Sequence, residues 1–249
     1  MPPALHALAI ASLAAGLLCA AWIALDVRRR PPQMWIMALV WPLSALFGSL
    51  AVLALYLGAG RAPRAADQHQ HHHHGQHPDH HPHHGHNQGP PALLAVAKGA
   101  LHCGSGCTLG DILAETLAFL FPAVAVAFGW HWLFADRIFA VWVLDFILAF
   151  GFGVAFQYFA IAPMRNLGLR EGLKQAMKAD ALSLTAWQVG MYGFMAIAHF
   201  WLFPVVIGSP LGTDSPEFWF MMQIAMACGF VTALPVNSWL IRRGIKEAM

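Results

Sequence analysis

Apolar residues in this chain occur in long runs that are separated by short polar segments. Each run is long enough for a transmembrane helix, which needs about 20 apolar residues to cross a hydrocarbon layer of about 30 Å. The pattern predicts an all-α integral membrane helical bundle of about six transmembrane helices. The expected helices cover residues 4–25, 34–59, 110–133, 137–161, 181–207 and 217–241.

One polar segment, over residues 61–91, divides the runs unequally. It contains eleven of the chain's 15 histidines, interspersed with Pro and Gly, and has almost nothing apolar to pack. We therefore expect a disordered His-rich loop, because such a composition cannot offset the entropy of folding. A two-helix membrane segment over residues 1–60 precedes it, and a four-helix membrane core over residues 92–249 follows.

The composition agrees with a membrane protein and excludes other classes. Hydrophobic residues make up 58% of the chain and charged residues 10%, whereas a soluble domain has roughly 25% charged residues. The basic blocks lie beside apolar runs, where membrane topology explains them, so no nucleic acid is expected as a partner. The expected partners are the lipid bilayer and metal ions, with a second copy of the chain or another membrane subunit as a further partner.

The charges also indicate an orientation in a bacterial inner membrane. The first run has no basic start and is too long for a cleaved signal peptide, so it is expected to stay as a helix. In a six-helix arrangement, the side with both termini and the His-rich loop carries ten of the 14 Lys and Arg residues. The positive-inside rule then places both termini and this loop in the cytoplasm. Arg28, Arg29 and Arg30, directly after the first run, argue for the opposite orientation.

The densest candidate chemistry precedes the third run. Cys103, Cys107, Asp111 and Glu115 recur every four residues, so in a helix they fall on one stripe. Three glycines among them also permit a turn, with the helix beginning near Thr108. The pair of thiols is open to three interpretations: metal ligands, a redox pair, or inert side chains in a helix entry rich in small residues.

Metal binding is the first hypothesis for both this stripe and the His-rich loop. Thiolates and imidazoles are ligands for Cu, Zn, Ni and Co, and carboxylates extend the set. A tract dense in histidine would gather such ions beside the membrane, although a low-complexity spacer and a pH-sensitive loop are alternatives. The candidate ligands are His102, Cys103, Cys107, Asp111 and Glu115, with His71, His72, His73, His74, His80, His81, His83 and His84 of the tract.

Polar residues inside the later runs suggest a transport path. Asp145 lies eight residues into an apolar run, and a carboxylate at a helix centre costs about 2.5–3.5 kcal/mol on insertion scales, which makes it a functional candidate. Asp180, Gln188 and Asn237 are the other candidates for this path. Their alternative role is to hold helices together by hydrogen bonds of about 0.6 kcal/mol each.

Three segments resemble a family of bacterial membrane proteins catalogued as domain of unknown function 4396. They cover residues 102–111, 179–183 and 235–241, with Gly244 following, and the resemblance extends over residues 98–249. It implies a compact four-helix membrane core but no activity. It draws attention to the residues that match its motifs, which are Cys107, Gly110, Asp111, Asp180 and Asn237.

The sequence thus favours a transporter, or an accessory protein of transport, for a transition-metal ion. A second hypothesis is a membrane thiol or haem oxidoreductase that uses Cys103 and Cys107, or His131 and His199 as axial ligands. A third is a scaffold subunit without a catalytic site. Only the second of these would make the protein an enzyme.

Overall fold

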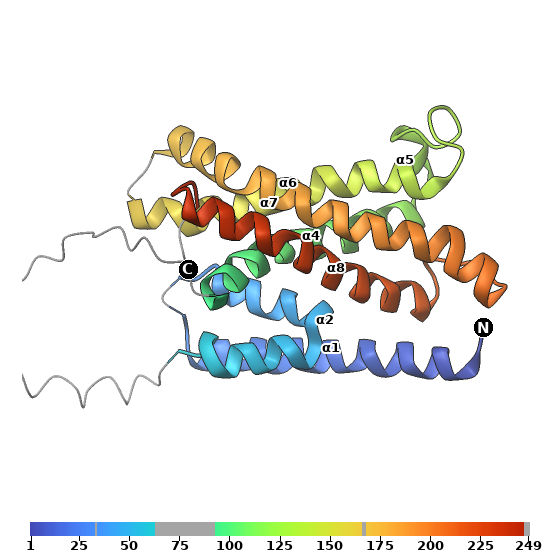
Figure 1. Cartoon of the computed structure of the whole chain (residues 1–249), viewed down its shortest axis with the longest axis horizontal. Coiled ribbons are helices and arrows are strands. Elements are labelled where there is room, and N and C mark those ends of the chain that lie inside the picture. The colour runs from blue at the N-terminus through green and yellow to red at the C-terminus, as the bar shows by residue number, and fades with distance from the viewer. Residues whose placement is uncertain (33, 63–92, 166–167, 247–249) are drawn as a thin grey trace, which may run out of the picture.

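A computed structural model of the chain describes residues 1–32, 34–62, 93–165 and 168–246, and these ranges contain helices and no strands (Figure 1). The predicted tract ligands, from His71 to His84, lie outside the described residues. The helices are α1 (Pro3–Arg29), α2 (Met37–Leu55), α4 (Leu93–Leu120), α5 (Pro122–Ala127), α6 (Arg137–Arg165), α7 (Leu169–Ile197) and α8 (Pro216–Arg242), and π-helical turns η1 (Tyr56–Gly60) and η2 (Ala198–Ile207) extend α2 and α7.

The chain is a helical membrane protein. Five helical segments of its described part are long and apolar enough to cross a membrane, namely α1, α2 with η1, α6, α7 with η2, and α8. Helix α4 has 28 residues but is not among them. Its central residues are buried by the other helices, so Cys103, Cys107, Asp111 and Glu115 face protein and not lipid. A helix that is enclosed by other helices does not contact lipid on every side, so it can carry polar residues on part of its surface.

Helix α2 does not continue straight into η1. It breaks at Ser49, where φ is 41° and ψ is −122°, and the chain then folds back along its own path (Figure 1). The rings of Trp41 and Tyr56 lie 5.5 Å apart between centroids, whereas a straight helix would separate these positions by about 22 Å. Residues 37–60 therefore form a helical hairpin and not the single crossing helix that the apolar run predicted.

The hairpin returns to the end of the bundle from which it enters. Asp26, in the last turns of α1, accepts hydrogen bonds from the Arg61 guanidinium, with Nε to Oδ2 and Nη2 to Oδ1 both 2.8 Å. The Tyr56 hydroxyl donates to the same carboxylate at 2.9 Å. These bonds attach the second arm of the hairpin, η1 and the residue after it, to the last turns of α1.

The two ends of the described chain lie at opposite ends of the bundle (Figure 1). Met1 Sδ is 3.1 Å from Ser209 Oγ, and His6 Nδ1 is 2.8 Å from Glu217 Oε1, so α1 begins beside the start of α8. Lys246, beyond the end of α8, contacts Gly99 near the start of α4. We call these the Met1 end and the Lys246 end. Met1 and Lys246 thus lie at opposite ends of the bundle, which does not support the prediction that both termini lie on one side.

Glycines on α4 bring its backbone against α6. A Cβ placed on Gly106 would lie 2.7 Å from the Gly153 nitrogen, and one placed on Gly110 would lie 2.6 Å from the Ala149 nitrogen. Small residues of this kind allow membrane helices to approach closely. The glycines therefore serve helix packing, and α4 begins at Leu93, well before both the predicted helix start at 110 and the alternative start near Thr108.

The other predicted helices are close to those observed, except that α7 begins earlier. The apolar run predicted a start at residue 181, but α7 starts at Leu169. Charged residues in the first turns lower the hydropathy of this part without interrupting the helix. Hydropathy marks the membrane boundary, whereas backbone hydrogen bonding decides where the helix begins.

Candidate functional site

The stripe predicted from the four-residue spacing is present on α4. Cys103, Cys107, Asp111 and Glu115 all lie in this one helix and expose 0%, 0%, 3% and 4% of their surface. From Cys103 to Glu115 the stripe covers about 18 Å along the helix axis. It connects a polar cluster near the Lys246 end with a cavity at the Met1 end.

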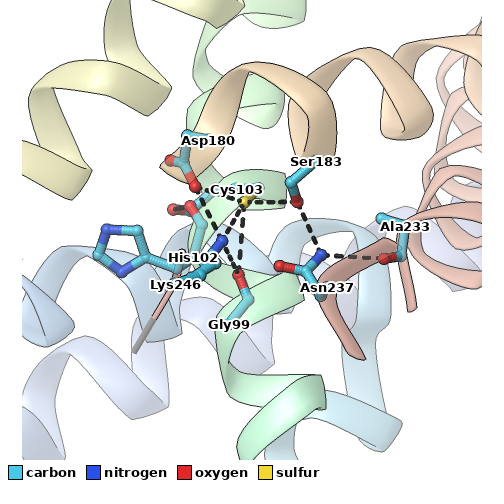
Figure 2. Close-up of polar contacts among 9 residues, drawn as sticks. Gly99, His102, Cys103, Asp180, Ser183, Ala233, Asn237 and Lys246 are labelled. Atoms are coloured by element: carbon cyan, nitrogen blue, oxygen red, sulfur yellow. Dashed lines mark hydrogen bonds and ion pairs between the residues drawn. The ribbon is translucent and has the colours of Figure 1, made fainter. Parts of the chain in front are cut away.

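The first cluster surrounds the Lys246 ammonium (Figure 2). Lys246 Nζ lies 2.8 Å from Asp180 Oδ1, 3.0 Å from Cys103 Sγ and 3.3 Å from the Gly99 carbonyl oxygen. Cys103 Sγ is also 3.3 Å from Asp180 Oδ1. We call the group the Lys246 cluster, and its members are Gly99, Cys103, Asp180, Ser183, Asn237 and Lys246.

Ser183 and Asn237 complete the cluster on the side facing α8. Cys103 Sγ is 3.1 Å from Ser183 Oγ. The Asn237 amide donates to Ser183 Oγ at 2.7 Å and to the Ala233 carbonyl at 2.9 Å. The thiol is therefore linked to α7 and, through a hydroxyl and an amide, to α8 (Figure 2).

The three segments that carry the family resemblance meet in this cluster. Cys103 belongs to the first segment, residues 102–111, whereas residues 179–183 supply Asp180 and Ser183. Residues 235–241 supply Asn237. Tertiary structure thus brings together positions that lie far apart in the sequence.

Lys246 is the charged member of the cluster that the sequence did not single out, because it is part of a basic block beside a membrane helix. Its side chain and that of Asp180 are both fully buried. Burial by itself would lower the pKa of Lys246, but the Asp180 carboxylate and the Cys103 side chain raise that pKa above its ordinary value. Since Asp180 already balances the ammonium charge, the cluster does not require Cys103 to be a thiolate.

A second, acidic cluster lies further along α4. The Tyr192 hydroxyl donates to Asp145 Oδ2 at 2.6 Å, and the Gln188 amide nitrogen is 3.4 Å from the same oxygen. The Asp111 carboxyl group, on α4, lies beside that of Asp145, on α6. Tyr192 is a further residue that the sequence did not single out.

A cavity reaches the stripe from the Met1 end. It has a volume of about 360 Å³, and its lining includes Glu115, Asp136, Arg137 and His199. Glu115 Oε2 and one Arg137 guanidinium nitrogen are buried there without a hydrogen-bond partner. Glu115 lies one turn of α4 from Asp111, so the cavity ends next to the acidic cluster.

Other predicted residues are not brought together. The His102 ring packs edge-on against Phe156, with centroids 6.4 Å apart, and Figure 2 shows it away from the Cys103 contacts. All four cysteines are free thiols. Within the described ranges, no three His, Cys, Asp or Glu side chains are grouped closely enough to hold a metal ion. The metal ligands therefore stay a prediction.

The two histidines of the haem alternative lie towards the Met1 end. His131 is exposed and stacks on Trp130, with ring centroids 4.1 Å apart. His199 Nε2 is 3.4 Å from Asp136 Oδ2. No contact in the described structure favours an axial role for either.

Fold and site together define a helical membrane protein with an enclosed polar stripe. The chain belongs to the family of the domain of unknown function DUF4396, which it matches over residues 94–246. No curated protein and no solved structure matches it. The matched region covers the Lys246 cluster and the acidic cluster, and it leaves α1 and the hairpin outside.

Proposed function

We propose that the chain transports a transition-metal ion, such as Cu, Zn, Ni or Co, along the buried stripe of α4 in exchange for protons. The observation that carries this proposal is the continuity of the stripe. It runs from the cavity at Glu115 through the Asp111 and Asp145 pair to Cys107 and Cys103. Ionisable residues inside a membrane bundle are costly and are usually retained for function.

The acidic cluster supports the proton half of the exchange. Two neighbouring carboxylates repel each other when both are ionised, and a proton bound between Asp111 and Asp145 would relieve that repulsion. A cation that approaches along the stripe would displace this proton, and departure of the cation would allow it to bind again. Tyr192 and Gln188 hold Asp145 in place for either state.

The thiols and the His-rich tract support the metal half. Cys103 and Cys107 offer soft ligands on the same face of α4, and such ligands select Cu(I) and Zn(II) over alkali and alkaline-earth ions. The tract follows Arg61 and precedes Leu93, and both of these residues lie at the Lys246 end. Ions gathered by its imidazoles would thus be concentrated at the end of the bundle nearest Cys103.

The basic residues support an orientation with the Lys246 end in the cytoplasm of a bacterial cell. Arg137 is the one Lys or Arg at the Met1 end among the residues that the structure describes. The positive-inside rule places the basic side of a membrane protein in the cytoplasm. Arg28, Arg29 and Arg30 agree with this placement once residues 37–60 are a hairpin.

Transport in proteoliposomes tests the proposal. Vesicles that contain the protein and a zinc-sensitive dye should take up Zn²⁺ when their interior is acidic, with outward proton movement reported by a pH dye. Asp145→Asn should abolish both signals, because the amide keeps the size of the side chain but cannot bind or release the proton. Glu171→Gln, on the exposed start of α7, is the matched control and should transport as wild type does. Equal uptake in Asp145→Asn and wild type, or uptake no faster than in empty vesicles, would contradict the proposal.

A further inference from the structure

Lys246 is much more enclosed than its position in the sequence requires. A lysine beside a membrane helix ordinarily extends its side chain to the water interface. Here the Lys246 and Asp180 side chains are both completely buried, although Arg242, Arg243 and Gly244 immediately before are exposed. The ammonium is thus held inside the bundle by specific partners.

The surroundings of the ammonium contain more acceptors than it can use. Its three N–H groups are directed to Asp180 Oδ1, the Gly99 carbonyl and Cys103 Sγ. Asp180 Oδ2 and Asn237 Oδ1 are also buried, and neither has a hydrogen-bond partner. Asn237 Oδ1 and Lys246 Cε lie on the same side of Gly99, 3.8 Å and 3.6 Å from the point where a Cβ on that glycine would lie. Oxygen and sulfur acceptors around one positive charge are the arrangement of a cation-binding site.

A short tether holds the ammonium there. Gly244 has a φ of 65°, its N–H donates to the Ile241 carbonyl at 3.0 Å, and the next N–H donates to the Leu240 carbonyl at 3.0 Å. This pair of bonds is a Schellman turn, which ends a helix and reverses the chain. The turn directs Lys246 back into the bundle. Withdrawal of the side chain would need changes in this turn only, and α8 would stay intact.

We propose that the Lys246 ammonium is a tethered occupant of a metal-binding site formed by Cys103, Asp180, Asn237 and the Gly99 carbonyl, and that a divalent transition-metal ion competes with it. The charges balance in this exchange. A divalent ion bound by the Asp180 carboxylate and the Cys103 thiolate adds two positive charges. The ammonium withdraws from the cluster and the Cys103 thiol releases its proton to solvent, which removes two positive charges. The net charge of the cluster is therefore unchanged. The class of ion rests on the proposed function, whereas the site rests on the geometry of the Lys246 cluster.

Removal of the ammonium tests this inference in the full-length, detergent-purified protein with Co²⁺ as the probe. Cobalt bound to a thiolate gives a charge-transfer absorption in the near ultraviolet, which ligation by histidine alone does not give. Lys246→Met leaves the Asp180 carboxylate without its cation, so this variant should develop the band at Co²⁺ concentrations where wild type does not. Lys174→Met, at an exposed lysine of α7, should behave as wild type, and adding Cys103→Ser to Lys246→Met should remove the band.

A second variant keeps the lysine and disturbs only its tether. Gly244→Ala meets no neighbouring atom, but its positive φ costs an alanine roughly 1–2 kcal/mol. It should show the band at Co²⁺ concentrations between those for Lys246→Met and wild type. If the Lys246→Met variant folds but does not develop the band, Asp180 is neutralised by a proton and the inference is overturned. Equal bands in wild type and in Lys246→Met would also overturn it. Cobalt binding without vesicle transport would remove the proposed function alone.

Discussion

Cys103 and Cys107 are equivalent in the sequence but not in the structure. Cys103 contacts Asp180, 77 positions away, and Lys246, 143 positions away. The four-residue spacing predicted that both thiols share one face of a helix, because that depends on local geometry alone. Partners so distant in the chain are set by helix packing, and the spacing carries no information on them.

A prediction at this scale concerns the glycines of α4. Gly106→Ala should lower the free energy of unfolding by about 1–3 kcal/mol, because an added Cβ meets the backbone of α6 and forces the helices apart. Gly151→Ala is the control, since nothing lies within 4 Å of its added Cβ. Thermal unfolding in detergent, followed by circular dichroism, compares the two. Equal losses in both variants would show that the close packing of α4 and α6 is not what requires Gly106.

The hairpin of α2 and η1 shows how an apolar run can mislead at the scale of an element. Residues 37–60 have the length and composition of a crossing helix. Composition reports that a segment avoids water, but it does not report whether the chain turns back inside the bundle. The turn at Ser49 and the hydrogen bonds that Arg61 and Tyr56 donate to Asp26 fold this segment back on itself.

Cysteine labelling can distinguish the hairpin from a crossing helix. Arg29→Cys and Ala62→Cys lie before and after the hairpin, at exposed and half-buried positions. A membrane-impermeant maleimide should label both from the same face of the membrane, because the hairpin returns to the Lys246 end. The wild-type chain, with three of its four cysteines buried, gives the background. Labelling of the two positions from opposite faces would mean that this segment crosses.

For the whole molecule, the hairpin decides at which end of the bundle each basic block lies. The six-helix arrangement divides the basic residues between the two sides, and Arg28, Arg29 and Arg30 conflict with the rest. In the described structure, α1, α4, α6, α7 and α8 run between the two ends (Figure 1), and the basic residues other than Arg137 gather at the Lys246 end.

This arrangement predicts which loops are reached from outside the cell. In intact bacteria, an impermeant maleimide should label Trp132→Cys, which replaces an exposed residue at the Met1 end, and should leave Lys174→Cys unlabelled. Permeabilised cells should show labelling of both, which confirms that each cysteine is reactive. The reverse pattern in intact cells would invert the proposed orientation.

The sequence by itself determined the membrane class, the helical fold, the positions of α6 and α8, and the stripe on α4. Each of these follows from residues close together in the chain, through hydropathy or through the helical period. Only the tertiary structure decided that residues 37–60 turn back, that α4 is enclosed, and that Lys246 lies between Asp180 and Cys103. Those features depend on which helices pack together, and the packing brings charges from distant segments into contact within the bundle.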